Sequence, residues 1–216
     1  MARVLYYGSG SPYAWRVQFA LEHKALPYER KVLSFSAGDT RTPEFAALNP
    51  RRRVPVLVDD DFTLYESNAI VEYLDEAYPG RGEPLFPGDV RTRALVRRFI
   101  SEADNDMNKV GEPLWHEAFA VKPDARDAAR LDSAKQALRE EFALIARSMR
   151  GDFLAGPLSA ADYALYPLVA YSRRAERKLP GFRLDECLPP ELAAWMRRIE
   201  ALPYFDTCYP PHWKTS

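Results

Sequence analysis

Cysteine and histidine are scarce in this sequence, with 2 and 3 residues respectively among 216. Cys187 and Cys208 lie well apart and form no CxxC motif. This scarcity argues against a disulfide framework and against a zinc site. We therefore expect a reducing, cytoplasmic environment and no metal in the functional site.

The sequence has no excess of positive or negative charge, and it contains no long apolar run. The 30 Lys and Arg residues face 31 Asp and Glu residues, for a formal net charge of −1. Such a balance gives no general electrostatic footprint for nucleic acid or an anionic membrane. The apolar runs are far shorter than the ~20 residues that span a bilayer, and no apolar signal core opens the chain. We expect no export, no membrane insertion and no nucleic-acid partner.

The composition, 47% hydrophobic and 28% charged, suits a soluble globular protein of one or two domains. The first part of the chain carries alternating strand and helix signals. In order, these are a strand at 2–7, a helix from Pro12, a strand at 28–34, a hairpin at 54–65 and a helix at 66–78. This order predicts an α/β, thioredoxin-like domain over residues 1–79.

A segment rich in glycine and proline then changes the character of the chain. Residues 80–89 interrupt the periodic patterns and are predicted to be an interdomain linker. From residue 90 onward, long helical patterns dominate and strand signals are few. We therefore expect an all-helical second domain over residues 90–216.

The tetrapeptide Ser11-Pro12-Tyr13-Ala14 follows the first strand. It keeps the Pro-Tyr centre of a CPYC dithiol motif, but other residues replace both cysteines. Serine before proline is the expected arrangement of a helix N-cap, which is the structural interpretation. A cap uses the hydroxyl oxygen as acceptor and leaves the O–H able to donate elsewhere. A ligand thiol placed here would meet this donor and the positive end of the helix, and both favour a thiolate.

Two effects at Ser11 are large enough to hold a ligand thiol as a thiolate. A free thiol with a pKa of ~8.5 is only a few per cent ionised at pH 7. Lowering that pKa by about two units requires about 2.7 kcal/mol. A hydrogen bond to a charged acceptor contributes roughly 1.5–3 kcal/mol and a helix N-terminus about 0.3–1 kcal/mol more. The two suffice without a metal.

Proline interrupts a strand-like segment at Val54-Pro55, where it cannot donate to a sheet. An edge position explains this, and so does a cis bond that turns the valine backbone outward to pair with a peptide ligand. Both interpretations stay open. The preceding residues Arg51, Arg52 and Arg53 are typical of a solvated turn, and one of them could bind a ligand carboxylate.

Glu66-Ser67 stands between a strand-like and a helical segment. One interpretation is another helix cap. The other is a headgroup site, in which the Ser67 hydroxyl and N–H groups at the helix start hold a carboxylate while Glu66 meets an ammonium. That pairing fits an α-amino acid.

Ser159 and Asp162 have the spacing of a capping box before an apolar run. We assign this pair to folding, since no histidine near it in the sequence would complete a hydrolase site. Trp115, His116 and Phe119 either line a hydrophobic pocket or belong to the core, and for His116 a core or surface role is favoured.

Together, three segments resemble the cytosolic glutathione transferases over nearly the whole chain. They are SPYAWRVQFALEHKALPYE, NPRRRVPVLVDDDFTLYESNAIVEYLDE and GPLSAADYALYP, in the order and spacing of that family. The resemblance implies a serine-type enzyme of the zeta, tau or phi kind, with a thioredoxin-like domain followed by an all-helical domain. It also implies glutathione as co-substrate, a hydrophobic electrophile as second substrate, and a homodimer.

The resemblance assigns roles to particular residues. Ser11 matches the activating serine, and Val54 matches the residue whose backbone pairs with the cysteinyl unit of glutathione before a cis-proline, here Pro55. Glu66 and Ser67 match the pair that binds the γ-glutamyl unit. The remaining assignments are Arg53 near the glycyl end and, for the hydrophobic pocket, Tyr13, Met107, Trp115 and Phe119.

Two of these assignments have alternatives or additions. Tyrosine-type classes activate the thiol from the first strand, so Tyr6 and Tyr7 are alternatives to Ser11. In the helical domain, Asp104 or Asp106 is the aspartate that would reach the glutathione of the partner subunit.

We therefore expect a glutathione transferase in which Ser11 stabilises the thiolate for attack on a hydrophobic electrophile. A dehalogenase and a zeta-like maleylacetoacetate isomerase are variants of that enzyme. Pro12-Tyr13-Ala14 replaces the serine and cysteine run of the zeta class, which argues against the isomerase. An alternative of another kind is a non-catalytic binding or assembly module with the same fold. The matching residues Ser11, Val54, Glu66 and Ser67 argue against that module.

Overall fold

The computed structural model describes residues 3–214, which form two compact units. One unit comprises residues 3–87 together with 203–214, and the other comprises residues 88–202. The first unit is built on a sheet with helices and the second is helical. The predicted fold class, an α/β thioredoxin-like part followed by an all-helical part, is confirmed.

The first unit contains one mixed sheet of four strands. Its elements are β1 (Arg3–Tyr7), α1 (Pro12–His23), β2 (Glu29–Val32), a 3₁₀ turn (Asp39–Arg41), α2 (Pro43–Leu48), β3 (Val56–Asp59), β4 (Phe62–Tyr65) and α3 (Ser67–Ala77). The strand order is β2-β1-β3-β4. β1 runs parallel to β2 and antiparallel to β3, and β4 runs antiparallel to β3.

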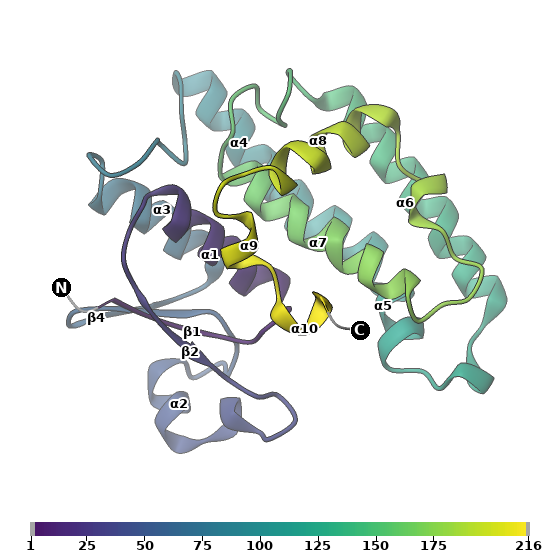
Figure 1. Cartoon of the computed structure of the whole chain (residues 1–216), viewed down its shortest axis with the longest axis horizontal. Helices are drawn as coiled ribbons and strands as arrows, with labels where there is room; N and C mark the ends of the chain where they lie inside the picture. The colour runs from purple at the N-terminus through teal and green to yellow at the C-terminus, as the bar shows by residue number, and fades with distance from the viewer. Residues whose placement is uncertain (1–2, 215–216) are drawn as a thin grey trace. The chain divides into compact units, whose positions relative to one another are not determined.

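Helices cover both faces of this sheet, as Figure 1 shows. α1 and α3 pack together on one face, and α2 lies on the other. Burial alternates along β1, and its central Leu5 pairs with Leu57 of β3, both fully buried. The core therefore fixes β1, and with it the turn that leads from Tyr7 to α1.

The structure bears out the expected hairpin and adds a helix that the sequence pattern did not reveal. β3 and β4 meet at an acidic turn in which Asp60 has a φ of +54°. The added helix is α2, whose N-cap Thr42 accepts a hydrogen bond from Phe45 N at 3.2 Å. Its start signal, threonine followed by Pro43, is present in the sequence. With six residues, however, α2 is too short to show a helical period.

One carboxylate anchors the segment expected to be a linker. Asp75 of α3 accepts hydrogen bonds from the backbone N–H of Leu85 at 2.8 Å and of Phe86 at 3.1 Å. It also pairs with the ammonium of Lys24, which is 1% exposed, at 3.0 Å. The middle of residues 80–89 is thereby held against the first unit.

The last described residues also belong to the first unit. They contain α9 (Phe205–Cys208) and α10 (Pro211–Lys214), and α9 lies against α1 (Figure 1). Trp15 of α1 contacts Phe205, Tyr209 and Trp213 at ring-centroid separations of 6.3, 5.8 and 5.6 Å. From the sequence these residues are expected in the helical domain, because the pattern after residue 90 is helical. Their aromatic contacts attach them to α1 instead.

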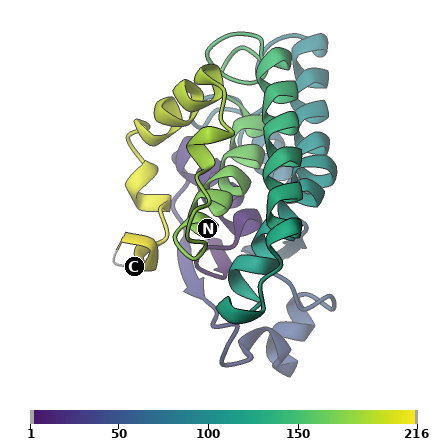
Figure 2. The same ribbon diagram turned by 90° about the vertical axis from the view of Figure 1, so that its right-hand side faces the viewer.

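The second unit is a bundle of helices that run alongside one another, seen from the side in Figure 2. Its elements are α4 (Val90–Glu102), a π-helical turn (Ala103–Met107), α5 (Asn108–Phe119), α6 (Ala128–Ser148), α7 (Ala160–Glu176), α8 (Pro190–Glu200) and 3₁₀ turns at Pro123–Ala125 and Leu184–Glu186. α7 packs against α4 and α5, and α5 packs against α6. No helix within residues 3–214 combines the length and the apolarity needed to cross a membrane.

A buried capping box starts α7, as the sequence predicts. Ser159 and Asp162 are both 0% exposed. Asp162 accepts hydrogen bonds from Ser159 N at 2.9 Å, Leu154 N at 3.0 Å and Trp195 Nε1 at 2.8 Å. Burial raises the pKa of this carboxyl to about 6, although the donors act in the opposite direction. Since Trp195 belongs to α8, the carboxylate joins α7 to α8.

Candidate functional site

Ser11 closes the turn between β1 and α1. Its N–H donates to Gly8 O at 3.0 Å, and its Oγ accepts from Ala14 N at 3.4 Å. This cap bond is long, and the next residue, Pro12, has no N–H to offer. The Ser11 side chain is partly exposed, and within residues 3–214 its O–H donates to no group. The structure therefore places a hydroxyl that is able to donate at a helix N-terminus.

An aromatic side chain covers the beginning of this turn. A Cβ at Gly8 would clash with the ring of Phe35, so a larger residue there would have to displace that ring. Phe35 follows β2 and is 57% exposed. The sequence gives little signal for this residue, because a single aromatic residue in a loop belongs to no periodic pattern. Phe35 forms one wall beside the turn that carries Ser11.

The Val54–Pro55 bond is cis, which is one of the two interpretations that the sequence left open. Val54 is half-buried and precedes β3, whose pairing with β1 and β4 begins at Val56. Within the described part of the chain, the Val54 N–H and C=O make no backbone hydrogen bond. The backbone of Val54 is therefore available to a ligand.

Glu66 and Ser67 stand where β4 ends and α3 begins. Glu66 has a φ of +72°, which costs a non-glycine residue about 1–3 kcal/mol. Its carboxylate is exposed and pairs with no group among residues 3–214. Ser67 is 7% exposed. A strained backbone thus presents an exposed acidic group beside a buried hydroxyl.

A buried arginine from α1 holds the start of α3. Arg16 is 2% exposed, and its Nη1 donates to Ser67 Oγ at 3.3 Å and to Asn68 Oδ1. Its Cζ also lies 5.4 Å from the ring centroid of Tyr13. A buried positive charge beside the N–H groups of a helix start attracts anions. Arg16 is not among the site residues expected from the sequence, although a charged residue inside the apolar run of α1 was a usable signal.

The three arginines before Val54 form the exposed turn that the sequence favours. Asn49, which is 2% exposed, builds this turn. Its Nδ2 donates to Arg53 O at 2.7 Å, and its Oδ1 accepts from Arg51 N at 2.9 Å. The Arg53 guanidinium is exposed and contacts no charged group within residues 3–214. It is therefore available to an anionic ligand.

Tyr6 and Tyr7 point to opposite faces of the sheet, because side chains alternate along β1. Tyr6 lies on the α2 face, with its ring 6.2 Å from Phe45 and its hydroxyl 3.5 Å from Lys31 Nζ. Tyr7 is 9% exposed. Of the hydroxyl groups of Tyr6, Tyr7 and Ser11, only that of Ser11 lies at a helix N-terminus.

Two of the predicted pocket residues form an aromatic cluster on the helical unit. Trp115 and Phe119 lie 5.3 and 4.9 Å from Tyr171, measured between ring centroids. Phe119 is 41% exposed. Met107 is 0% exposed and belongs to the packed interior, whereas Tyr13 belongs to the first unit.

Asp104 and Asp106 lie in the π-helical turn that joins α4 to α5. Asp106 is exposed and Asp104 is partly exposed. Burial raises the pKa of Glu141 on α6, and the nearby charges of Asp106 and Glu102 add to this effect. Acidic groups therefore gather at this turn.

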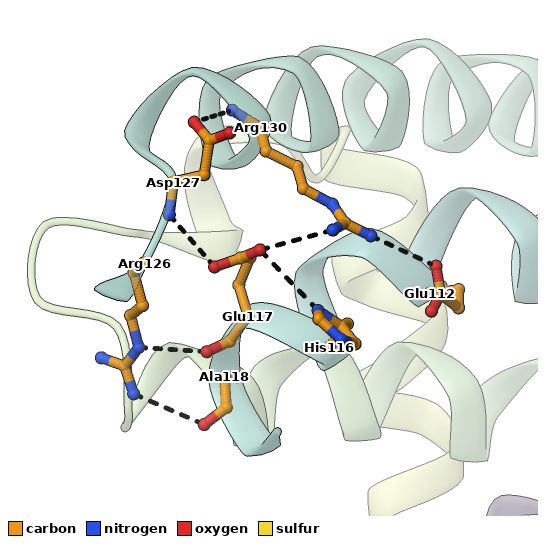
Figure 3. A network of polar contacts seen from close by, with 7 residues as sticks. All are labelled: Glu112, His116, Glu117, Ala118, Arg126, Asp127 and Arg130. Atoms are coloured by element: carbon orange, nitrogen blue, oxygen red, sulfur yellow. Dashed lines mark hydrogen bonds and ion pairs between the residues drawn. The ribbon is translucent and has the colours of Figure 1, made fainter. Parts of the chain in front are cut away.

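A separate polar network lies where α5 ends and α6 begins (Figure 3). The carboxylate of Glu117, which is 3% exposed, accepts from Asp127 N at 3.2 Å and pairs with Arg130 at 3.6 Å and His116 at 3.7 Å. Arg126 donates to the last carbonyls of α5. These contacts satisfy a buried charge and a helix end, so the network connects helices. The His116 side chain is 43% exposed, so of the core and surface roles that the sequence left open for it, the structure has the surface one.

The sequence is similar to known proteins over both units. Residues 10–77 match the model of the glutathione S-transferase N-terminal domain, and residues 123–198 match that of the C-terminal domain. Glutathione S-transferase A of Pleuronectes platessa is 30% identical, covering 98% of this chain and 93% of that protein. A probable maleylacetoacetate isomerase of Vibrio cholerae serotype O1 is 31% identical, covering 97% of this chain and 96% of that protein.

The same similarity is found in three dimensions. The crystal structure of a glutathione S-transferase from the Antarctic clam Laternula elliptica has a TM-score of 0.84 to this chain and 30% sequence identity. The match covers 100% of this chain and 95% of that one. Sequence and fold similarity therefore extend over the same nearly complete length.

Proposed function

Because this chain belongs to the glutathione S-transferase family, and is therefore an enzyme that acts with glutathione, we propose that Ser11 holds the glutathione sulfur as a thiolate. The observation that carries this proposal is the Ser11 hydroxyl, which is partly exposed at the start of α1 and has a proton to donate. The Ser11 O–H donates to the sulfur, and the α1 N-terminus adds positive potential.

The reaction follows from these two effects. The glutathione thiol loses its proton to solvent, and the Ser11 hydrogen bond lowers its pKa so that more thiolate exists near neutral pH. The sulfur then attacks an electrophilic carbon and forms a C–S bond. Where that carbon bears a leaving group such as a halide, the group departs with the electron pair of the broken bond.

The start of α3 holds the γ-glutamyl end of glutathione in this proposal. The Ser67 hydroxyl and the helix N–H groups bind its α-carboxylate, while buried Arg16 contributes positive potential. Glu66 pairs with the α-ammonium, for which its exposed carboxylate is suited. The strain at Glu66 supports such a role, since strained residues cluster at functional sites.

The segment before β3 binds the rest of the tripeptide. The backbone N–H and C=O of Val54, ahead of Pro55, pair with the cysteinyl unit in the manner of an added strand. The exposed guanidinium of Arg53 binds the glycyl carboxylate. Glutathione is then held at three points, with its sulfur directed to Ser11.

The electrophile is an apolar molecule in this proposal. The aromatic cluster of Trp115, Phe119 and Tyr171 on the helical unit offers apolar contacts for it. Apolar walls with few polar groups are typical of small-molecule sites.

A homodimer in the cytoplasm is the expected setting. This expectation rests on the family resemblance, and it gives Asp104 or Asp106 the role of contacting glutathione bound by the partner subunit. Light scattering on the purified protein measures the mass, which for a dimer is twice the chain mass of 24.7 kDa.

A maleylacetoacetate isomerase is the second candidate, favoured by the relative from Vibrio cholerae serotype O1 at 31% identity. In such an enzyme the thiolate adds to a substrate and leaves again. Pro12-Tyr13-Ala14 stands where the zeta class has its serine and cysteine run, which favours transfer over isomerisation.

Calorimetry with glutathione, followed by turnover with an apolar aryl halide and with maleylacetoacetate, tests these alternatives. We expect glutathione binding and faster conjugation of the aryl halide. Isomerisation without conjugation would support the second candidate. Absent glutathione binding would contradict both and leave a binding or assembly module.

A further inference from the structure

The C-terminal segment lies against the turn that carries Ser11. Both belong to the first unit. A hydrogen bond of 3.0 Å joins Ser9 Oγ and His212 Nδ1. A Cβ on Gly10, whose φ is +85°, would lie 3.1 Å from Trp213 Nε1 and 3.3 Å from His212 Cε1. The two residues directly before Ser11 thus contact two successive residues of α10.

Aromatic packing anchors α10 at this place. Trp213 is 5% exposed and stands edge-on to Trp15, with ring centroids 5.6 Å apart and planes at 87°. Trp15 is 1% exposed and follows Ser11 by one helical turn. Tyr209 contacts both rings, at 5.8 and 6.1 Å. The buried cluster therefore fixes α10 relative to the start of α1.

The local contacts of Ser11 fix its hydroxyl only weakly. Its cap bond to Ala14 N is 3.4 Å long. The preceding turn contains Gly8 and Gly10, and glycine has more backbone conformations available than other residues. Phe35 packs on Gly8, while α10 supplies contacts to Ser9 and Gly10. The turn is thus held by contacts from distant parts of the sequence.

We propose that His212 and Trp213 are positioning residues for the Ser11 hydroxyl, an inference that rests on the function proposed above for Ser11. They act through Ser9 and Gly10 by holding the turn in one conformation. Stabilising a thiolate requires the donor to be placed within about 0.5 Å and 10–20° of its productive geometry. The C-terminal segment therefore sets how strongly the thiolate is stabilised.

The test is the pKa of the thiol of bound glutathione, read from the ultraviolet absorbance of the thiolate against pH. His212→Ala removes the bond to Ser9, and His212→Asn places an amide near the position of Nδ1. For His212→Ala we expect the thiol pKa to rise by about 0.5–1 unit, which is about three- to tenfold less thiolate below that pKa. kcat/KM for an aryl halide should fall by the same factor, with glutathione affinity within about twofold. His212→Asn should restore most of both.

Tyr204→Phe is the matched control. The Tyr204 hydroxyl and His23 Nδ1 are also joined at 3.0 Å, between the same C-terminal segment and the far end of α1. This variant should leave the thiol pKa unchanged. Ser9→Ala removes the His212 bond from the other side and should reproduce the His212→Ala shift. It replaces His212→Ala if circular dichroism shows that variant to be misfolded.

The outcomes separate this inference from the proposed function through Ser11→Ala, measured in the same series. A parental thiol pKa in folded His212→Ala or Ser9→Ala, together with a raised pKa in Ser11→Ala, overturns the inference and leaves the proposed function standing. A parental pKa in Ser11→Ala overturns both. An equal shift in Tyr204→Phe also overturns the inference, because the effect would then come from general loosening of the segment.

Discussion

Ser11 and Ser159 both precede a helix as its N-cap, one in each unit, but their surroundings differ. Ser159 is 0% exposed and shares a capping box with Asp162, to which its Oγ donates at 3.2 Å. Ser11 is partly exposed, and its one side-chain hydrogen bond within residues 3–214 is the 3.4 Å cap bond. Ser159 has both its donor and its acceptor engaged, whereas Ser11 keeps its donor.

The difference separates a serine whose hydroxyl is used up in folding contacts from one whose hydroxyl can still donate to a ligand. Both occur in sequence patterns that predict a cap, so residue type and helix position do not distinguish them. The two serines are distinguished by their exposure and by whether the O–H already donates to a neighbouring group. Substitutions at the two helix starts should therefore have different effects, and the largest is expected at the buried one.

Asp162→Ala should have the largest effect, on stability. It leaves three buried N–H donors, from Leu154, Ser159 and Trp195, without their acceptor. Each such loss costs about 1–3 kcal/mol, so we expect the free energy of unfolding to fall by at least about 3 kcal/mol. Urea unfolding followed by tryptophan fluorescence measures it. A loss below about 1 kcal/mol would contradict the structural role of the capping box.

The pH dependence of stability gives a second test of the buried capping box, through the carboxyl of Asp162. The pKa of Asp162 is about 6 in the folded protein against an ordinary 3.8, so the folded state binds this proton more tightly than the unfolded chain. The group therefore favours folding most below about pH 4, and that contribution is lost as the pH rises to about 6. A shift of this size is worth about 3 kcal/mol.

Comparison with Asp162→Asn isolates that contribution, because asparagine does not titrate. From pH 4 to pH 7, the stability of the parent should fall by up to about 3 kcal/mol relative to the variant. A constant difference between parent and variant would show that the carboxyl stays ionised in the folded state over this range.

Glu66→Ala and Ser67→Ala probe a third helix start, which combines a buried serine with an exposed acid. Each should weaken glutathione binding by roughly 1.5–3 kcal/mol, or about 10- to 100-fold, because a charge-assisted contact is lost. Turnover at saturating glutathione should change much less, since the proposed role of these groups is to hold the headgroup, which lies away from the sulfur. Calorimetry and steady-state kinetics measure the two quantities. If turnover collapses while affinity stays normal, the proposed headgroup role is wrong.

Local signals in the sequence predict much of the fold. Ser11-Pro12 marks the start of α1, the acidic residues at Asp60 mark the hairpin, and Ser159 with Asp162 marks α7. Each rests on contacts between neighbours in the chain, which spacing can reveal. The short helix α2 was not predicted, because six residues are too few to show a helical period.

Contacts between distant residues account for what the sequence did not reveal. Arg16 meets Ser67 across 51 positions, and Ser9 meets His212 across 203. Neither pair leaves a local pattern. The return of the C-terminal segment to α1 depends on the cluster around Trp15, and single aromatic residues carry no information about their partners.

Ultraviolet titration of bound glutathione in Ser11→Ala and Ser159→Ala tests most directly whether the Ser11 hydroxyl stabilises the glutathione thiolate. In Ser11→Ala the thiol pKa should rise by about one to two units, and activity lost near neutral pH should partly return as the pH increases. Ser159→Ala should leave the thiol pKa unchanged and lower the free energy of unfolding by about 1 kcal/mol. A parental titration in a folded, glutathione-binding Ser11→Ala protein would contradict the account and turn attention to Tyr6 and Tyr7.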